Sequence, residues 1–245
     1  MSYLVPNIAI ALLLFANSAF SLELNSSDTK ATVIELYTSE GCSSCPPADE
    51  WLSTLKDDSR LFKQIIPMAF HVDYWDELGW KDPWSKPKFT ERQRKQSLSA
   101  TTPAAFVGLF SQIYTPAFLV EGQEWPKWYS YKKLPMIPPV KAGILTAKLD
   151  GQTLTVNFSE KGDYELNVAY LGMGLVSNVT AGENRSRKLK HDFVVLNLFQ
   201  KKGDSSWQLT IPAVPKEGQK ETAISIWVTK PDSIHIEQAV AAYIE

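Results

Sequence analysis

Cys42 and Cys45 are the only cysteines of this chain, and two residues separate them. The pair follows the apolar run of residues 32–37 and precedes residues 46–52, which are typical of a helix start. Two thiols at this spacing can open and close a disulfide with little backbone movement. A helix N-terminus stabilises a thiolate, the species that attacks disulfides and binds metal ions. The motif therefore indicates redox exchange, metal capture or a local covalent staple.

Thiol–disulfide exchange assigns a different task to each cysteine. We expect Cys42 to attack, because the first cysteine of such a motif lies at the helix end and faces solvent. Cys45, about one helical turn further in, is the expected resolving thiol. Ser43 and Ser44 add no charge between them, so we expect the pKa of the Cys42 thiol to be lowered only modestly.

Glu35 is the only charged residue in the apolar run before the dithiol. A carboxylate in a buried strand is costly to ionise, which suits it to exchanging protons. We therefore interpret Glu35 as the candidate proton-transfer group of the pair. The alternative is an edge-facing or ion-paired glutamate, because buried charged residues are usually paired.

The first half of the chain alternates between strand and helix patterns. Near-continuous apolar runs predict strands that are buried on both faces, and apolar residues at helical spacing lie between them. Strand, helix and strand in so short a span predict a βαβ unit with parallel strands. The predicted strands cover residues 32–38, 65–72 and 117–120, and the predicted helices cover residues 48–55 and 89–99.

The second half has short alternating runs that predict an antiparallel β-sandwich. Asp150-Gly151 between two of these runs is a strong hairpin signal. We expect a signal peptide at residues 1–21, an α/β domain at residues 29–138 and an all-β domain at residues 139–245. The predicted strands are residues 144–149, 153–159, 164–171, 193–200, 207–211, 223–229 and 234–241.

The N-terminal sequence indicates where the protein acts, and the net charge argues against one class of function. Residues 8–15 are apolar, and Ala19-Phe20-Ser21 fits the small-x-small pattern of a signal-peptide cleavage site. The apolar stretch is shorter than a membrane span, so we expect an exported chain, periplasmic or secreted, without a membrane anchor. Disulfides persist in such compartments. The net charge of -2 argues against nucleic-acid binding.

Several segments carry a resemblance to a known family. They are residues 33–49, 70–76, 78–83, 114–116, 182–185 and 191–192. The sequence resembles the secreted thioredoxin-like proteins grouped as domain-of-unknown-function family 1223. This resemblance implies a thioredoxin-like α/β domain, followed here by an all-β sandwich-like domain. It also implies a cis peptide bond between Thr115 and Pro116 beside the dithiol, with the backbone of Thr115 free to pair with an extended substrate.

An aromatic loop at residues 73–84 follows the second predicted strand. It is expected at the same end of the sheet as the dithiol, where α/β sites collect. Asp73, Trp75, Trp80 and Trp84 are candidates to wall a cleft over Cys42. The alternative is that the tryptophans only pack the loop, with Trp75 the first candidate for a binding role. We take Asp73, Trp75, Thr115 and Pro116 as the candidate substrate-binding residues.

His71 makes metal binding an alternative to thiol–disulfide exchange. A histidine with two cysteines can hold copper, so Cys42, Cys45 and His71 are a candidate ligand set. The competing interpretation is a hydrogen-bonded core histidine. His191 and His235 have no ligand-like spacing, and no fourth zinc ligand is visible in the sequence.

The sequence thus predicts an exported thiol–disulfide oxidoreductase that needs no cofactor. Its substrates are protein or small-molecule thiols and disulfides, and its redox partner is unidentified. One alternative is a copper-binding, chaperone-like module. Another is a non-catalytic binding protein with a structural disulfide, although closing so short a loop gives little entropic stabilisation.

Overall fold

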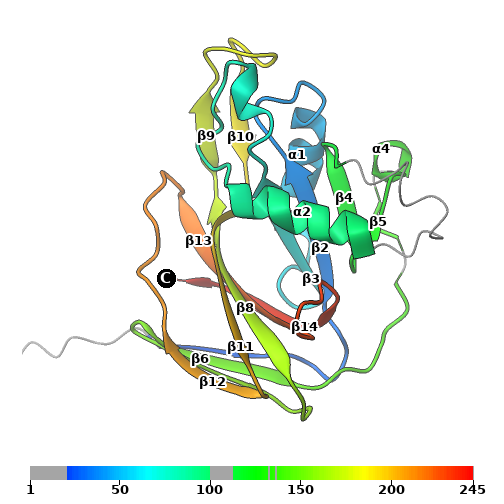
Figure 1. Ribbon diagram of the computed structural model, residues 1–245, viewed down its shortest axis with the longest axis vertical. Helices are drawn as coiled ribbons and strands as arrows, with labels where there is room; N and C mark the ends of the chain where they lie inside the picture. Colours follow the sequence, from blue (N-terminus) through cyan, green and yellow to red (C-terminus); the bar gives the residue numbers. More distant parts are fainter. Residues whose placement is uncertain (1–20, 100–112, 132, 136, 245) are drawn as a thin grey trace, which may run out of the picture.

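The computed structural model describes residues 21–99, 113–131, 133–135 and 137–244. Its largest element is a mixed eight-stranded sheet with the strand order β14-β13-β8-β11-β3-β2-β4-β5 (Figure 1). The strands of this long sheet are β2 (Thr32–Thr38), β3 (Ile65–His71), β4 (Ala117–Val120), β5 (Gln123–Glu124), β8 (Tyr164–Met173), β11 (Val194–Gly203), β13 (Glu221–Thr229) and β14 (Ile236–Ile244).

The predicted fold class, a thioredoxin-like α/β domain followed by a separate β-sandwich, is wrong. β11 pairs in parallel with β3 where Val194 meets Ala69, so strands of the second half extend the sheet of the first. The described part of the chain is mostly β, with few helices, and the long sheet takes strands from both sides of the expected boundary between residues 138 and 139. The physical reason is the edge of β3: its backbone groups need partners, and β11 supplies them.

The middle of the long sheet is built as its sequence predicts. β2 and β3 are parallel, with Thr32 opposite Ile65 and Thr38 opposite His71, and both strands are almost wholly buried. Apolar residues on both faces are typical of such covered parallel strands. β4 pairs antiparallel with the other side of β2.

Helices cover this part of the sheet. α2 (Pro87–Ser99) crosses one face of the sheet, and α1 (Pro46–Ser53) lies beside β2 and β4 (Figure 1). Phe89 of α2 is fully buried, with its ring centroid 5.4 Å from that of Phe70. Among the described residues, the other short helices are η1 (Thr54–Asp57), η2 (Asp76–Leu78) and α4 (Trp128–Tyr131).

A four-stranded antiparallel sheet with the order β1-β6-β7-β12 forms a sandwich with the other part of the long sheet. Leu145 and Val156 of the smaller sheet share one apolar core with Leu166 and Ile226 of the long sheet. The predicted hairpin between β6 and β7 is confirmed, and its turn contains Gly151 with a φ of 58°. The strands are β1 (Ser21–Asn25), β6 (Leu145–Asp150), β7 (Thr153–Phe158) and β12 (Ser206–Thr210).

A two-stranded hairpin of β9 (Leu175–Asn178) and β10 (Lys188–His191) was not predicted. It follows β8 directly, and β10 lies against α1 (Figure 1). The hairpin therefore carries residues of the second half to the helix that begins with the dithiol.

Most of the expected signal peptide, residues 1–20, lies outside the described residues; Ser21 begins β1. Among the helices that the structure describes, none is long and apolar enough to cross a membrane.

Candidate functional site

The dithiol lies at the N-terminus of α1, as the sequence predicts. Cys45 is the N-cap, and its carbonyl accepts the backbone N–H groups of Ala48 at 2.8 Å and Asp49 at 3.1 Å. Pro46 and Pro47 open the helix, where their missing N–H groups are not needed. Both cysteines are free thiols. The motif therefore lies at the positive end of the helix dipole.

Both thiols are buried. Cys42 is 1% exposed and Cys45 is 0% exposed, so the prediction that Cys42 faces solvent is wrong. The Cys42 Sγ atom lies 3.2 Å from the Ser44 Oγ atom and 3.7 Å from the carbonyl oxygen of Thr115. The neighbouring loops close over the end of the helix, and they are described next.

The two thiols differ in acidity. A hydrogen bond from the Cys45 thiol, opposed by burial and aided by Ser44, lowers the pKa of Cys42 to about 6. Burial raises the pKa of Cys45, and so do the neighbouring Cys42 and Asp49. At neutral pH the pair therefore holds one thiolate and one thiol, with the pKa of Cys42 lowered further than the modest shift that the sequence predicts.

Thr115 and Trp75 lie beside the dithiol. The Thr115–Pro116 peptide bond is cis, as the resemblance implies. The indole Nε1 of Trp75 donates to the Thr115 Oγ1 atom at 2.8 Å. A β-carbon placed on Gly41 would lie only 2.8 Å from the Trp75 Cβ atom, so Trp75 packs directly on the backbone before Cys42. Among the residues of the aromatic loop, Trp75 therefore lies beside the dithiol, where a residue that lines the site must lie.

The other loop candidates point elsewhere. The Asp73 carboxylate accepts the hydroxyl of Thr90 on α2, and its backbone N–H donates to the same hydroxyl at 3.2 Å. The Trp80 indole donates to the Glu40 carboxylate at 2.8 Å, and Trp84 is buried. A direct role of Asp73 toward a substrate stays a prediction, and its described contacts connect the loop to α2.

Glu35 is buried and paired. Its carboxylate accepts hydrogen bonds from the Arg92 guanidinium, at 3.0 Å from Nε, and from the Gln96 amide. The alternative interpretation, that Glu35 is ion-paired, is therefore confirmed. Proton transfer by Glu35 stays a prediction, whereas the acidic group that acts on the Cys45 thiol is Asp49.

The loop between β9 and β10 holds the dithiol loop in place. The Asn184 side-chain amide donates to the carbonyl oxygens of Glu40 at 2.8 Å and of Cys42 at 2.9 Å. The Glu183 carboxylate accepts the backbone N–H of Ser43 at 3.0 Å, and hydrogen bonds from the side chain and the backbone of Ser43 lower the pKa of Glu183. Glu183 and Asn184 belong to residues 182–185, one of the segments that carry the family resemblance. The resemblance did not assign a role to either residue.

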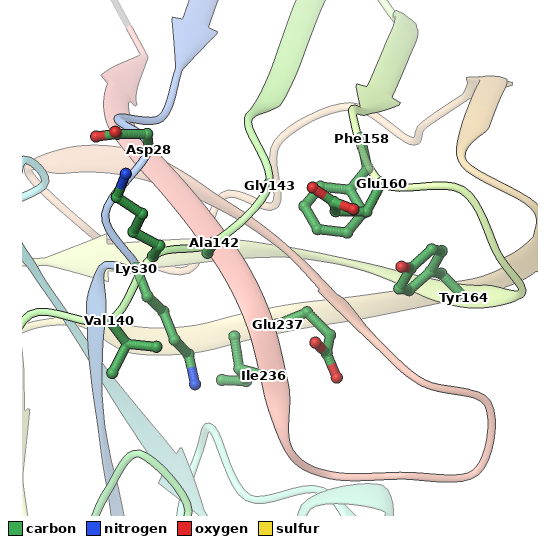
Figure 2. Close-up of a pocket in the computed structure, with 11 residues that line it drawn as sticks. Asp28, Lys30, Val140, Ala142, Gly143, Phe158, Glu160, Tyr164, Ile236 and Glu237 are labelled. Atoms are coloured by element: carbon green, nitrogen blue, oxygen red, sulfur yellow. The ribbon is translucent and has the colours of Figure 1, made fainter.

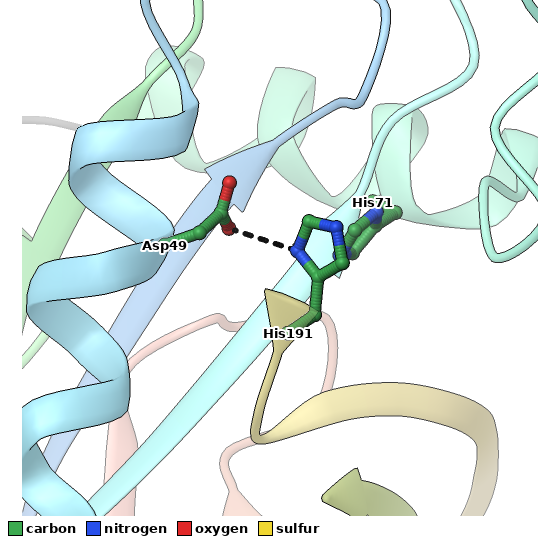
Figure 3. A group of neighbouring side chains, drawn as sticks. All are labelled: Asp49, His71 and His191. Atoms are coloured by element: carbon green, nitrogen blue, oxygen red, sulfur yellow. Dashed lines mark ion pairs between the residues drawn. The ribbon is translucent and has the colours of Figure 1, made fainter. Parts of the chain in front are cut away.

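A buried cluster of histidines and carboxylates lies behind α1. The His71 Nδ1 atom is 2.7 Å from Asp82 Oδ2, and the His191 Nε2 atom is 3.0 Å from Glu40 Oε1. The second nitrogen of His191, Nδ1, is 3.7 Å from Asp49 Oδ1 (Figure 3). All five residues are buried. The cluster adjoins the dithiol, because Asp49 follows Cys45 by one helical turn.

The cluster has strongly shifted acidities. Burial lowers the pKa of His191, but the Asp49 and Glu40 carboxylates outweigh burial and raise it to about 10. Burial raises the pKa of Asp82, yet His71 and the hydrogen bonds that Asp82 accepts bring it below its ordinary value. Sequence reasoning missed Glu40, Asp49, Asp82 and His191 as site residues, since no local spacing connects them.

The copper-binding alternative stays a prediction. Within the described parts of the chain, the group whose ligand atoms are close enough to share one ion is Asp49, His71 and His191, within 4.8 Å of one another. His71 therefore belongs to a different group of side chains from Cys42 and Cys45.

A pocket of about 560 Å³ lies at the sandwich, between the start of β14 and the loop before β6 (Figure 2). Lys30, Glu160 and Glu237 are among its lining residues. The pocket contains no residue of the dithiol or of the histidine cluster, so it is separate from this site.

Comparison with known proteins gives a family and a fold. The sequence model of a family described as "protein of unknown function (DUF1223)" matches residues 33–229. No curated protein matches the chain. The crystal structure of a structural-genomics target from Agrobacterium tumefaciens has a TM-score of 0.59 and 21% identity, covering 89% of this chain and 96% of that chain.

A second solved structure, HBP35 of Porphyromonas gingivalis, has a TM-score of 0.54 and 14% identity. The match covers 89% of this chain and 76% of that chain. At such low identities both likenesses show the fold alone.

Proposed function

Since this chain belongs to the DUF1223 family, whose description assigns no function, we propose an activity from the site itself: thiol–disulfide exchange. Cys42 is the attacking thiol and Cys45 is the resolving thiol. The substrates are protein or small-molecule disulfides and thiols.

The observation that best supports this proposal is the opposite shift of the two thiol pKa values. The pKa of Cys42 is lowered to about 6, and that of Cys45 is raised. An attacking thiol with a pKa below ambient pH is largely ionised, and the thiolate is the reactive form. The resolving thiol keeps its proton until the mixed disulfide has formed.

The reaction proceeds in two balanced steps. The Cys42 thiolate attacks one sulfur of a substrate disulfide; that disulfide breaks, and the other substrate sulfur leaves as a thiolate. Cys45 then gives its proton to the substrate thiolate released in the first step and attacks the Cys42 sulfur, which releases the second substrate thiolate. The protein ends as the Cys42–Cys45 disulfide and the substrate has gained two electrons. The reverse sequence oxidises a substrate dithiol.

Substrate entry requires a local rearrangement, because Cys42 is 1% exposed. In this proposal Trp75, which bonds to Thr115, moves aside so that an extended substrate segment can pair with the Thr115 backbone. Export of the protein, proposed from residues 8–21, would place the dithiol in a compartment where disulfides persist.

A redox titration tests the proposal. The full chain is equilibrated in mixtures of oxidised and reduced dithiothreitol, and free thiols are counted by alkylation and mass spectrometry. We expect a potential between roughly -120 and -270 mV, the range of working oxidoreductases. A potential below about -300 mV together with an unreactive Cys42 would identify a structural disulfide and reject exchange.

Variants give a second test. Cys42→Ser is expected to abolish reduction of a model protein disulfide, and Cys45→Ser to accumulate a mixed disulfide through Cys42. His235→Ala, an exposed substitution elsewhere, serves as the control with normal turnover. Turnover by Cys42→Ser would contradict the assignment of the attacking thiol.

A further inference from the structure

The two buried histidines have a feature that thiol exchange does not use. We propose that Asp49, His71 and His191 form a binding site for one divalent transition-metal ion of the zinc class, without the two cysteines. The three residues come from α1, the end of β3 and the end of β10, and their side chains converge beside α1 (Figure 3).

His71 has a nitrogen without a partner. Its Nδ1 atom is bonded to Asp82 at 2.7 Å, which assigns the Nδ1 proton to that bond and leaves a lone pair on Nε2. Nε2 is buried and has no hydrogen-bond partner among the described residues, although the side chain is 0% exposed. Buried polar atoms are rarely left unsatisfied, so an orphaned lone pair calls for a ligand.

His191 is held by a carboxylate in the same way as His71, but through Nε2 instead of Nδ1. Its Nε2 atom is bonded to Glu40 at 3.0 Å, while Nδ1 faces Asp49 at 3.7 Å, beyond hydrogen-bond distance. Nδ1 is also without a hydrogen-bond partner within the described chain. Histidines that bind metals almost always hold their second nitrogen against a carboxylate or carbonyl in this way. Here Asp82 and Glu40 hold one imidazole each.

The spacing is that of a loosely assembled site. The three ligand atoms lie within 4.8 Å of one another, whereas a tetrahedral zinc ion with bonds of about 2.0–2.2 Å needs them roughly 3.3 Å apart. Binding therefore requires the widest of these separations to contract by up to about 1.5 Å. The 3.7 Å between His191 Nδ1 and Asp49 Oδ1 is already close to that separation.

The donor set selects the class of ion. Two imidazole nitrogens and one carboxylate suit zinc and its transition-metal neighbours, whereas calcium and magnesium take oxygen ligands. Three protein ligands leave a fourth position for water or another donor, as in open zinc sites. The second oxygen of Asp49 is held by the Thr38 hydroxyl at 2.9 Å, which orients the carboxylate.

Zinc titration of the full chain after chelator treatment tests this site. The calorimetric titration is run at about pH 8, where zinc has to displace the proton that the Asp49 and Glu40 carboxylates hold on His191, so binding is expected to release a proton. We expect one zinc ion per chain, and the same stoichiometry in Cys42→Ser/Cys45→Ser. His71→Ala and His191→Ala are expected to lose binding. His235→Ala, which alters the third histidine of the chain at an exposed position, is the matched control and is expected to bind normally.

Two further measurements cover the case in which a histidine variant fails to fold. Cobalt bound to the unmodified chain is expected to show visible absorption typical of nitrogen and oxygen ligands, without thiolate charge-transfer bands in the near ultraviolet. Asp82→Asn, which keeps the shape of its partner for His71, is expected to weaken zinc binding about 10- to 100-fold.

The outcomes separate this site from thiol exchange. Stoichiometric zinc binding that survives loss of both cysteines and is lost with either histidine supports the site. No binding by the unmodified chain, thiolate bands in the cobalt spectrum, or undiminished binding by folded His71→Ala would overturn it.

Discussion

The long sheet buries charge in one part and almost none in the other. Where α1, α2 and β10 cover β2 and β3, ionisable side chains are enclosed within the packing. Among the described residues, the buried ones with ionisable acidic or basic groups, apart from the cysteines and tyrosines, are Glu35, Glu40, Asp49, His71, Asp82, Arg92, His191 and Asp192. All of them lie on or next to these covered elements.

The sandwich part buries polar residues of another kind. Across β8, β13 and β14 they are Asn167, Ser225, Thr229 and Gln238, and none carries a charge. Gln238 accepts the Ala31 N–H at 3.1 Å and donates to the Gly143 carbonyl at 3.1 Å, which is a structural task. Because buried charge is costly and clusters at functional sites, the difference supports the proposed placement of the chemistry in the helix-covered part.

Breaking the buried ion pair is expected to have the largest effect. Arg92→Met leaves the Glu35 carboxylate buried without its cation, which should lower the free energy of unfolding by about 3–5 kcal/mol. Urea denaturation measures this change. Glu35→Leu/Arg92→Met, which removes both charges, should recover most of the loss; an equal loss in the double variant would contradict the argument.

A cavity in the sandwich is expected to lower stability without altering the thiols. Leu145 is fully buried between the sheets, so Leu145→Ala should lower the free energy of unfolding by about 3 kcal/mol. The pH profile of Cys42 alkylation should stay that of the unmodified chain. A displaced profile would show that the two parts are coupled.

Removing the hydrogen bond between the thiols is expected to change the reactivity of Cys42. The pKa of this thiol is lowered to about 6, so its thiolate fraction, and with it the alkylation rate, falls as pH drops through 6. In Cys45→Ala the main cause of the lowered pKa is gone, and the midpoint should rise by about one unit or more, each unit being about 1.4 kcal/mol. An unchanged midpoint would assign the effect to the helix terminus instead.

Loosening Trp75 is expected to have the smallest effect. Trp75→Phe keeps an aromatic ring over Gly41 but deletes the hydrogen bond to Thr115, worth about 1 kcal/mol. The alkylation rate of Cys42 should therefore rise by about fivefold at constant pH. Trp207→Phe in the sandwich is the matched control, and a similar rise in that variant would remove Trp75 from the cover of the site.

The elements were predictable because their patterns are local. Residues 32–38 and 117–120 were predicted as strands, and β2 and β4 have those bounds. The helix that starts at Pro46 follows from the prolines after Cys45. Assembly was predicted wrongly, because the apolar pattern of β11 is the same whichever neighbour the strand takes. Its pairing with β3 depends on shape and edge satisfaction across the whole fold.

Only the part of the site formed by residues close together in the sequence or named by the family resemblance was predictable. Cys42, Cys45 and the cis bond before Pro116 follow from a motif and a resemblance. His191 was set aside for lack of spacing, although the β9–β10 hairpin brings its ring centroid within 5.0 Å of that of His71. The spacing of His71 and His191 in the sequence does not predict this contact. The contact depends on the β9–β10 hairpin, which leaves the main sheet and packs against α1.

The same hairpin sets the order in which the site is assembled during synthesis. Cys42 and Cys45 leave the ribosome long before Asn184, which holds the carbonyls of Glu40 and Cys42 in the finished fold. Until the hairpin arrives, the two thiols have the accessibility of an incompletely folded chain. Burial of the two thiols is therefore completed only after residue 184 has been synthesised and the hairpin has folded against them.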